Sequence, residues 1–294
     1  MLLQNLIFIV SKYYPKTPFW KINRLNLFAL STAEWLIRTF NLLPKDNVQI
    51  INGVKMYLDF STPYKAFQRY CHKFENEQIE FFKSVLKNGD VVLDLGAFQG
   101  DYALIAARKV GEHGKVYAFE PDPERYKFLL KNIKLNSFTN IEALQLACSD
   151  QDGYVEFAER DLMLNSILKD YGIHEPNPIK VKSTTLDSFI RSKNIIPTVI
   201  KIDIEGAELV ALEGMKRILE EHPVIFLELH PTLLPSHQLG IEKIIKILAD
   251  NNFLIYDWEK KSLINPNNKG DFIKDKLTWY AFVTKDSDLI KKLR

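Results

Sequence analysis

The chain has 294 residues, of which 46% are hydrophobic and 26% charged, and its formal net charge is +2. This is the composition of a soluble globular protein, with room for one α/β domain and appendages or for two small domains. The near-neutral charge gives no indication of nucleic-acid binding, and the two cysteines, Cys71 and Cys148, match no metal-binding spacing. We therefore expect a cytoplasmic protein with reduced cysteines.

Residues 1–45 differ from the rest of the chain in charge and in pattern. They carry six basic residues against one acidic residue, and the apolar run at 1–10 is far shorter than the ~20 residues that span a bilayer. This run has no positive n-region and no cleavage site, so a secretory signal is not expected. Apolar residues recur at helical spacing from Leu25 to Leu43. With Trp20 and Trp35 beside basic residues, the helix could lie on a membrane surface, or it could pack on the following domain or across a dimer.

A turn signal and a second helical pattern come next. Alternating residues on both sides of Asn52-Gly53 predict a hairpin over 48–60. A helix is expected from about Glu75 to Leu86. We therefore divide the chain into an N-terminal part, 1–74, made of a helical extension and the hairpin, and one α/β domain over 75–294.

The segment from Asp90 to Asp122 is the most informative part of the chain. A short apolar run ends in Asp94, Gly96 and Gly100 follow, a helical pattern comes next, and a second apolar run ends in Glu120. This order predicts a strand, a glycine turn, a helix and a second strand with an acid at its carboxyl end. Open parallel sheets bind nucleotide-like ligands at the carboxyl ends of their strands.

The glycine spacing argues against a phosphate-bearing ligand. Ala97 and Phe98 stand where a dinucleotide fingerprint has glycines, and no G-x-x-x-x-G-K-[ST] motif is present. An acid two residues before the first glycine suits a ligand with a positive amine and no phosphate, such as S-adenosylmethionine. We expect its aminoacyl end over Gly96 to Gly100, and its ribose hydroxyls on the Glu120 carboxylate. The alternative is an ordinary βαβ unit with a tight turn.

The rest of the chain alternates strands and helices, which predicts a mostly parallel sheet with helices on both faces. Strands are expected at Ile141–Leu146, Tyr154–Phe157, Ile179–Val181, Thr198–Ile202, Val224–Leu229, Phe253–Tyr256 and Trp279–Val283. Helices are expected at Asp101–Val110, after Pro123, at Glu208–Leu219 and at Ile241–Leu248. A loop is expected at Leu162–Pro178. No helix is expected between the last two strands, so they should pair antiparallel. A seven-stranded, mostly parallel sheet with an antiparallel edge hairpin is the class I Rossmann-like methyltransferase fold, and it is not the fold of dinucleotide dehydrogenases.

Two later strand ends bring further polar side chains to the same edge of the sheet. Asp203 ends one strand, with Glu205 and Glu208 just beyond it, and Glu228 and His230 end the next. Glu228 and His230 share a face because side chains alternate along a strand. If the methyl group of S-adenosylmethionine is transferred to a hydroxyl group, that hydroxyl must lose a proton. His230 could take it as a general base. Alternatively, Asp203 and Glu228 could bind Mg²⁺ that ionises the hydroxyl, which the sequence permits but does not require. The alternatives are that His230 only ends its strand and that the two other glutamates offset a helix dipole.

Five motifs, in order between about Glu75 and Pro231, resemble the FkbM family of methyltransferases: DVVLDLGAFQG, YAFEPDP, TTLDSF, IKIDIEGAELVALEGM and FLELHP. The resemblance implies O-methylation of a hydroxyl on a saccharide, glycoconjugate or secondary metabolite. The chemistry of this transfer makes Asp203, Glu228 and His230 the candidate catalytic residues. By position the resemblance implies that the cofactor is bound by Asp94, Gly96, Ala97, Gly100, Glu120, Pro121 and Asp150, the last at the adenine amino group. The family often has Ala-Asn-x-Gly in the turn, whereas Phe98 and Gln99 stand here, which leaves the aminoacyl contacts open.

Other functions compete with this interpretation. An NAD-dependent oxidoreductase is opposed by the glycine spacing and by the edge hairpin. A glycosyltransferase would need Asp286-Ser287-Asp288, which lies in a charged tail, and a hydrolase would need a G-x-S-x-G motif, which is absent. A non-catalytic, membrane-associated binding module on the same fold is the remaining alternative. We expect a small-molecule or glycan acceptor, no nucleic-acid partner, and peripheral membrane contact only through residues 1–45.

Overall fold

The computed structural model describes residues 48–57, 76–157, 178–234, 237–267 and 279–291. The helix predicted between Leu25 and Leu43 and nearly all of the loop predicted at Leu162–Pro178 lie outside these ranges. The chain divides into two compact units, residues 1–76 and 77–294, which we describe separately. Within the described ranges, no helix combines the length and the apolar character that crossing a bilayer requires.

The first unit contains the predicted hairpin. Strands β1 (Val48–Ile51) and β2 (Val54–Tyr57) pair antiparallel, with Ile51 opposite Val54. Asn52 and Gly53 form the turn with φ of 50° and 82°. Two positive φ angles are what a two-residue hairpin turn needs, and asparagine and glycine adopt them at least cost. The turn prediction is confirmed.

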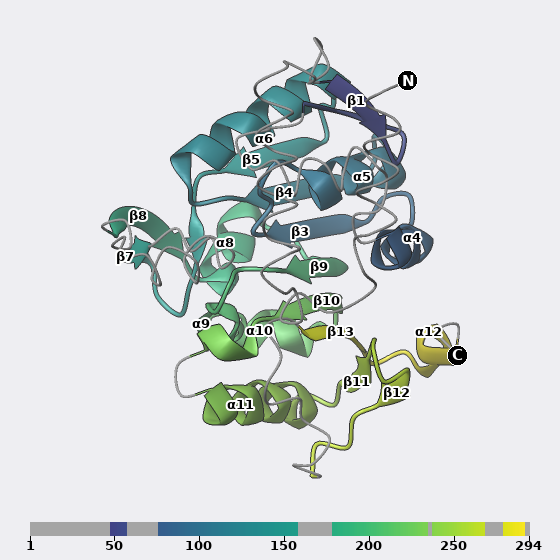
Figure 1. Ribbon diagram of the computed structural model, residues 1–294, viewed down its shortest axis with the longest axis vertical. Coiled ribbons are helices and arrows are strands. Elements are labelled where there is room, and N and C mark those ends of the chain that lie inside the picture. Colours follow the sequence, from purple (N-terminus) through teal and green to yellow (C-terminus); the bar gives the residue numbers. More distant parts are fainter. Residues whose placement is uncertain (1–47, 58–75, 158–177, 235–236, 268–278, 292–294) are drawn as a thin grey trace, which may run out of the picture. The chain divides into compact units, whose positions relative to one another are not determined.

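The second unit is built on one eight-stranded sheet, whose order is β12-β11-β13-β10-β9-β3-β4-β5 (Figure 1). Its strands are β3 (Val91–Leu95), β4 (Lys115–Phe119), β5 (Ile141–Leu144), β9 (Val199–Ile202), β10 (Val224–Leu229), β11 (Leu254–Asp257), β12 (Ser262–Leu263) and β13 (Trp279–Thr284). Strands β3, β4, β5, β9 and β10 are parallel, and β13 is antiparallel to both β10 and β11. The seven strands predicted for the main sheet and the antiparallel pairing at its edge are therefore confirmed. The two-residue strand β12 adds an eighth that was not predicted.

Helices cover both faces of this sheet, as predicted (Figure 1). They are α4 (Asn76–Val85), α5 (Asp101–Val110), α6 (Pro123–Asn136), α8 (Leu186–Lys193), α9 (Glu208–Glu213), α10 (Lys216–Glu220), α11 (His237–Asp250) and α12 (Ser287–Lys291). Apolar side chains of α8 to α11 form one core with Leu93, Ile200 and Ile225 of the central strands. On the opposite face, α4 packs Phe82 edge-on against Phe226 of β10. Burial on both faces explains why the central strands are continuous apolar runs.

The helix predicted from Glu208 to Leu219 is in fact two short helices, α9 and α10, so this prediction is wrong in part. The helix is interrupted at Gly214, whose backbone lies against Ser149. A Cβ atom on Gly214 would stand 2.1 Å from the Ser149 carbonyl oxygen. The Asp187 carboxylate then accepts hydrogen bonds from the backbone N–H groups of Arg217 (3.0 Å) and Ile218 (3.1 Å). Asp187 comes from α8, so a tertiary contact caps the second helix.

A small three-stranded sheet stands beside the main one. It has the order β6-β8-β7 and consists of β6 (Ala147–Cys148), β7 (Gly153–Phe157) and β8 (Ile179–Thr184). Strands β7 and β8 are the two predicted in this region, and they pair antiparallel. Helix α8, which was not predicted, follows β8. It is capped by Thr185, the residue before its first turn, whose hydroxyl accepts a hydrogen bond from the Ser188 N–H.

Candidate active site

The glycine turn after β3 is held tightly between two neighbouring strands. The N–H groups of Gly96 and Ala97 both donate to the Phe119 carbonyl oxygen at the end of β4, at 3.0 and 2.9 Å. On the other side, a Cβ atom on Gly96 would lie 1.8 Å from the Asp203 carbonyl oxygen, and Gly96 has φ of +79°. Both the close approach and the backbone conformation demand glycine here. The turn thus brings Gly96, Ala97 and Asp203 to one point at the carboxyl edge of the sheet.

Asp94 lies directly before this turn and is almost completely buried, with 1% of its surface exposed. Neither carboxylate oxygen has a hydrogen-bond partner among the described residues. Burial raises the pKa of Asp94 to about 7, against the opposing effect of the Lys201 ammonium. A buried carboxyl group without a hydrogen-bond donor is costly, and a ligand with a positive amine would relieve that cost.

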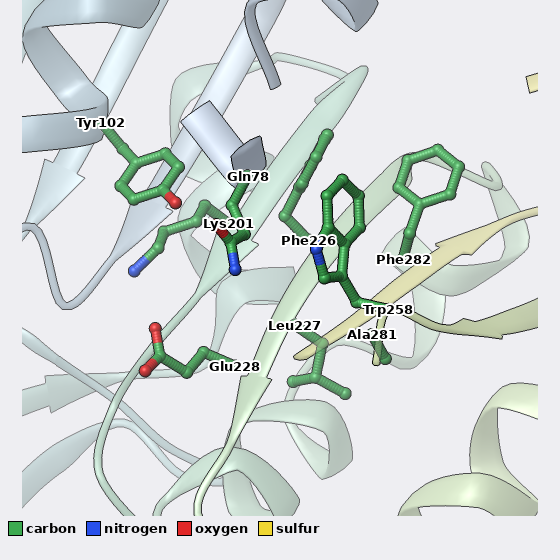
Figure 2. A pocket seen from close by; sticks show the side chains of 9 residues that line it. All are labelled: Gln78, Tyr102, Lys201, Phe226, Leu227, Glu228, Trp258, Ala281 and Phe282. Carbon is green, nitrogen blue, oxygen red and sulfur yellow. The ribbon is translucent and has the colours of Figure 1, made fainter. Parts of the chain in front are cut away.

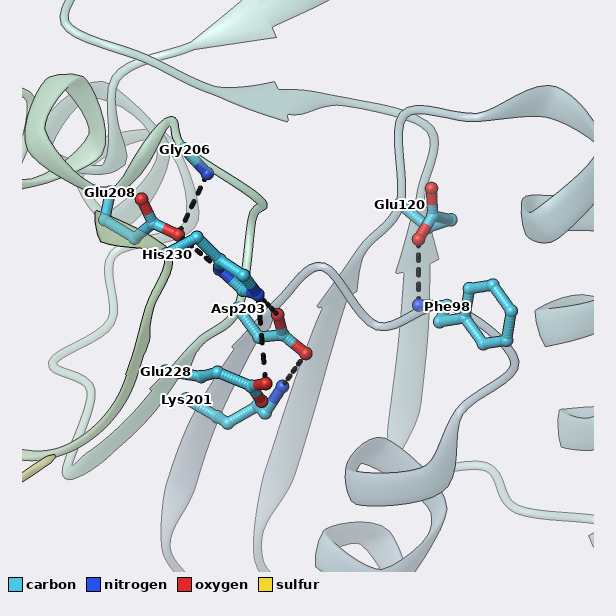
Figure 3. Close-up of polar contacts among 8 residues, drawn as sticks. All are labelled: Phe98, Glu120, Lys201, Asp203, Gly206, Glu208, Glu228 and His230. Carbon is cyan, nitrogen blue, oxygen red and sulfur yellow. Dashed lines mark hydrogen bonds and ion pairs between the residues drawn. The ribbon is translucent and has the colours of Figure 1, made fainter. Parts of the chain in front are cut away.

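Glu120 follows β4 and is also buried, with 3% exposed. Its oxygens accept hydrogen bonds from the backbone N–H groups of Phe98 (2.8 Å) and Asp122 (2.9 Å), and Figure 3 shows the first of these. Burial nevertheless outweighs both hydrogen bonds and raises the pKa of Glu120 to about 7. Each carboxylate oxygen can accept a further hydrogen bond, so the fixed carboxylate can still receive two hydroxyl donors.

Phe98 and Gln99, the two positions that depart from the family pattern, have definite places in the turn. Phe98 adopts φ of 50°, and its ring lies 4.8 Å from the Arg125 guanidinium. The Gln99 carbonyl oxygen accepts a hydrogen bond of 2.8 Å from the Asn132 side chain on α6. Helix α6 therefore supports the turn from outside, and Phe98 also supplies the N–H group that orients Glu120.

The remaining residues predicted to bind the cofactor are Gly100, Pro121 and Asp150. Gly100 has φ of 97°, is buried, and directly precedes α5, while Pro121 follows Glu120 and is half-buried. Asp150 is exposed after β6 and accepts a hydrogen bond of 3.1 Å from the Ser149 hydroxyl. Within the described part of the chain, no hydrogen bond or ion pair joins Asp150 to the other predicted site residues.

Asp203, Glu228 and His230 meet at the ends of β9 and β10, as the sequence predicts (Figure 3). His230 Nε2 lies 3.8 Å from Glu228 Oε1 and 4.0 Å from Asp203 Oδ1. The other Asp203 oxygen, Oδ2, accepts a hydrogen bond of 2.7 Å from the buried Lys201 ammonium. Lys201 in turn lies 4.7 Å from the centre of the Tyr102 ring. The three residues thus form one polar cluster beside the glycine turn.

Glu208 joins this cluster as a fourth acidic or basic residue, and it was not among the site residues predicted from the sequence. It is fully buried, accepts a hydrogen bond of 3.0 Å from the Gly206 N–H, and has its Oε1 2.9 Å from His230 Nδ1. A carboxylate can only accept, so Nδ1 carries the proton and the ring presents Nε2 to Asp203 and Glu228. The sequence signal for Glu208 was its spacing from Asp203, which places it in the first turn of the helix after β9 and so near the same edge of the sheet.

The electrostatics of the cluster favour a charged imidazole. Burial alone would lower the pKa of His230, but the hydrogen bond to Glu208 and the nearby Asp203 and Glu228 carboxylates raise it to about 9. The ligand atoms of Asp203, Glu228 and His230 all lie within 4.8 Å of one another, a separation that a metal ion could bridge. His230 therefore joins the two residues that the sequence suggested as metal ligands.

Comparison with known proteins identifies the family of the chain. The family model of the FkbM methyltransferase domain matches residues 94–255, more than half of the chain. Hexuronic acid methyltransferase AglP of Haloferax volcanii is 27% identical over 190 residues, covering 62% of this chain and 76% of AglP. An uncharacterized protein of Methanocaldococcus jannaschii is 36% identical over 115 residues, or 38% of this chain and 42% of that protein.

A solved structure, the methyltransferase FkbM of Methylobacillus flagellatus KT, aligns with 17% identity and a TM-score of 0.44 over 75% of this chain and 54% of that one. The matching family model is that of a methyltransferase domain and gives no support to the oxidoreductase alternative. The chain belongs to the FkbM methyltransferase domain family and is an S-adenosylmethionine-dependent methyltransferase.

Proposed function

We propose that this enzyme transfers the methyl group of S-adenosylmethionine to a hydroxyl group of a saccharide or glycoconjugate. The observation that carries the proposal is the convergence of Asp203, Glu228 and His230 beside the glycine turn. The sulfonium methyl is already electrophilic, so the protein must position the acceptor and take its proton. The name of AglP, a hexuronic acid methyltransferase, supports a saccharide as the acceptor class.

The cofactor contacts in this proposal follow the glycine turn. Asp94 faces the positively charged aminoacyl end, and Glu120 accepts hydrogen bonds from the ribose hydroxyls. What supports these roles is the buried Asp94 carboxylate without a hydrogen-bond donor and the orientation of Glu120 by two backbone N–H groups. Gly96 lets the turn pass against the end of β9, because a Cβ atom there would lie 1.8 Å from the Asp203 carbonyl oxygen. The full proposed set is Asp94, Gly96, Ala97, Gly100, Glu120, Pro121 and, at the adenine amino group, Asp150.

His230 is the proton acceptor in this proposal, through Nε2. Glu208 holds the opposite ring nitrogen, so the ring orientation is fixed before the acceptor arrives. With a pKa of about 9, the free enzyme has only about one neutral imidazole in a hundred at pH 7. A cationic ligand at the glycine turn disfavours the imidazolium and so increases this fraction. Lys201 donates a hydrogen bond to Asp203 and so holds its carboxylate in place beside the ring.

Mg²⁺ bound by Asp203 and Glu228, with His230 as a third ligand, is the other route to an ionised hydroxyl. The two routes differ in one measurement. Treatment with a chelator abolishes methyl transfer if the metal is needed and leaves the rate unchanged if His230 acts as the base. Re-addition of Mg²⁺ to the chelated enzyme is the control.

The test of the proposed function uses S-adenosylmethionine with an isotopically labelled methyl group and a panel of oligosaccharides that end in hexoses or hexuronic acids. The expected product carries the label as an alkali-stable methyl ether, located by mass-spectrometric fragmentation. An alkali-labile methyl ester would mean that a carboxylate is the acceptor, and label only on amines would contradict O-methylation. His230→Gln is expected to lower the rate by about 10²–10⁴-fold while S-adenosylhomocysteine binding is retained.

A further inference from the structure

A hollow beside the polar cluster combines aromatic and charged side chains from five elements (Figure 2). The empty space within it is about 350 Å³, a volume that includes open solvent at its mouth. It is lined by Gln78, Tyr102, Lys201, Phe226, Leu227, Glu228, Trp258, Ala281 and Phe282.

One wall of the hollow is aromatic and is held rigidly by Phe81 of α4. The Phe81 ring lies 5.4 Å from Trp258, 5.8 Å from Phe226 and 4.8 Å from Phe282, measured between ring centres. Phe226 and Phe282 also contact each other, at 5.2 Å. Because these rings are fixed by one another, a ligand that packs on them does not bear the entropic cost of ordering them. Such a wall suits the C–H face of a ring.

The opposite end of the hollow is charged and belongs to the polar cluster. Glu228 lines the hollow, and its Oε1 is 3.8 Å from His230 Nε2. Lys201 also lines it and donates to Asp203. In Figure 2, Glu228 and Lys201 lie at one end of the hollow and the Trp258 and Phe282 rings at the other. A ligand ring on the aromatic wall is therefore directed towards the group that we propose as the proton acceptor.

We infer that this hollow is the acceptor site and that it takes a single pyranose ring, with a C–H face on the aromatic wall and hydroxyl groups at the Glu228 end. A pyranose has both features, an apolar face and a rim of hydroxyl groups, and it carries no flat π-surface. Glu228 accepts and Lys201 donates, so the two can bind neighbouring hydroxyl groups. This inference rests on the proposed function, since it names where the saccharide binds.

The experiment uses Trp258→Ala, Trp258→Phe and, as a matched control, Tyr154→Ala, which removes an aromatic residue of β7 that is 61% exposed and outside the hollow. With a saccharide acceptor, Trp258→Ala is expected to raise KM about 10–100-fold and to leave S-adenosylhomocysteine affinity unchanged. Trp258→Phe should recover most of the loss, and Tyr154→Ala should match the wild type. An unchanged acceptor KM in Trp258→Ala would place the saccharide elsewhere.

A binding measurement separates this inference from the proposed function. Saturation-transfer NMR of the full chain with S-adenosylhomocysteine and methyl β-D-glucoside or methyl β-D-glucuronoside needs no turnover. Contact of the ring C–H protons with the wild type, lost in Trp258→Ala, is expected even if methyl transfer to these small glycosides is slow. No contact with the wild type overturns the inference. A Trp258-dependent signal from a phenol but from neither glycoside identifies the hollow as a site for aromatic acceptors and overturns the saccharide assignment.

Discussion

At the scale of single residues, two buried carboxyl groups dominate the proposed cofactor site. Burial raises the pKa of both Asp94 and Glu120 to about 7, so at pH 6 each is mostly protonated and at pH 8 each is mostly ionised. In the proposed site the ionised forms bind the ligand ammonium and hydroxyl groups, so we expect binding to be coupled to proton release. Affinity for S-adenosylhomocysteine is therefore expected to rise from pH 6 to pH 8, by about tenfold for each carboxyl group that ionises.

Titration calorimetry at several pH values measures this dependence directly. Asp94→Asn keeps the shape of the side chain but removes one ionisation, so it should bind more weakly at pH 8 and show a shallower pH dependence. Equal wild-type affinity at pH 6 and pH 8 would contradict ionisation of either group on binding.

In the proposed mechanism Glu208 acts only through His230 and is therefore a positioning residue. Its carboxylate raises the pKa of His230, whereas Glu208→Gln keeps an acceptor oxygen for Nδ1–H and removes the charge. Because the base must be neutral, activity rises with pH through the His230 pKa. The acid limb of the pH profile of kcat/KM is therefore expected to move to lower pH in Glu208→Gln, with S-adenosylhomocysteine affinity unchanged. A lower rate at every pH with the limb in its wild-type position would mean that Glu208 is only structural.

At the scale of elements, the start of α10, directly after the break from α9, depends on Asp187. This carboxylate satisfies two backbone N–H groups at the start of α10. Asp187→Ala is expected to lower the free energy of unfolding by about 0.5–2 kcal/mol, the usual cost of losing a helix cap, and so to lower Tm by a few degrees. Asp250→Ala is the matched control, because Asp250 is exposed on α11 and, within the described ranges, forms an ion pair with Lys246 one turn away. Equal Tm values for the two variants would refute the capping role.

The elements that could be predicted from sequence are those whose pattern reflects burial in the sheet. The apolar runs that became β3, β4, β9 and β10 ended at the acids that the structure places on one edge. The helix break was not predictable, because it arises from the close approach of Gly214 to Ser149 and from a cap supplied by Asp187, both distant in sequence. Strand β12 is too short to show a period.

The same limit applies to the candidate site. Asp203, Glu228 and His230 could be grouped because strand ends of a parallel sheet meet at one edge. The pairing of Glu208 with His230 could not be predicted, since an acid in a first helical turn is equally well explained by the helix dipole. Only the three-dimensional contact between Glu208 Oε1 and His230 Nδ1 distinguishes the two explanations.

At the scale of the whole molecule, every residue proposed to contact the cofactor lies between Asp94 and Asp150, in the second of the two compact units. Residues 1–45, with their excess of positive charge, supply none of them. Removing residues 1–45 is therefore expected to leave S-adenosylhomocysteine affinity unchanged.

Thermal unfolding measures the effect of this deletion on the whole second unit. A ligand at 100 times its Kd stabilises the folded state by about 2.7 kcal/mol, which for a unit of this size raises Tm by about 5–11 °C. The shortened chain should show the same rise as the full chain, provided that it unfolds cooperatively without ligand. Glu120→Ala in the full chain is the control and should lose most of the rise. A shortened chain that unfolds cooperatively but gains nothing from the ligand would show that residues 1–45 complete the cofactor site, because mass action stabilises only a site that is intact.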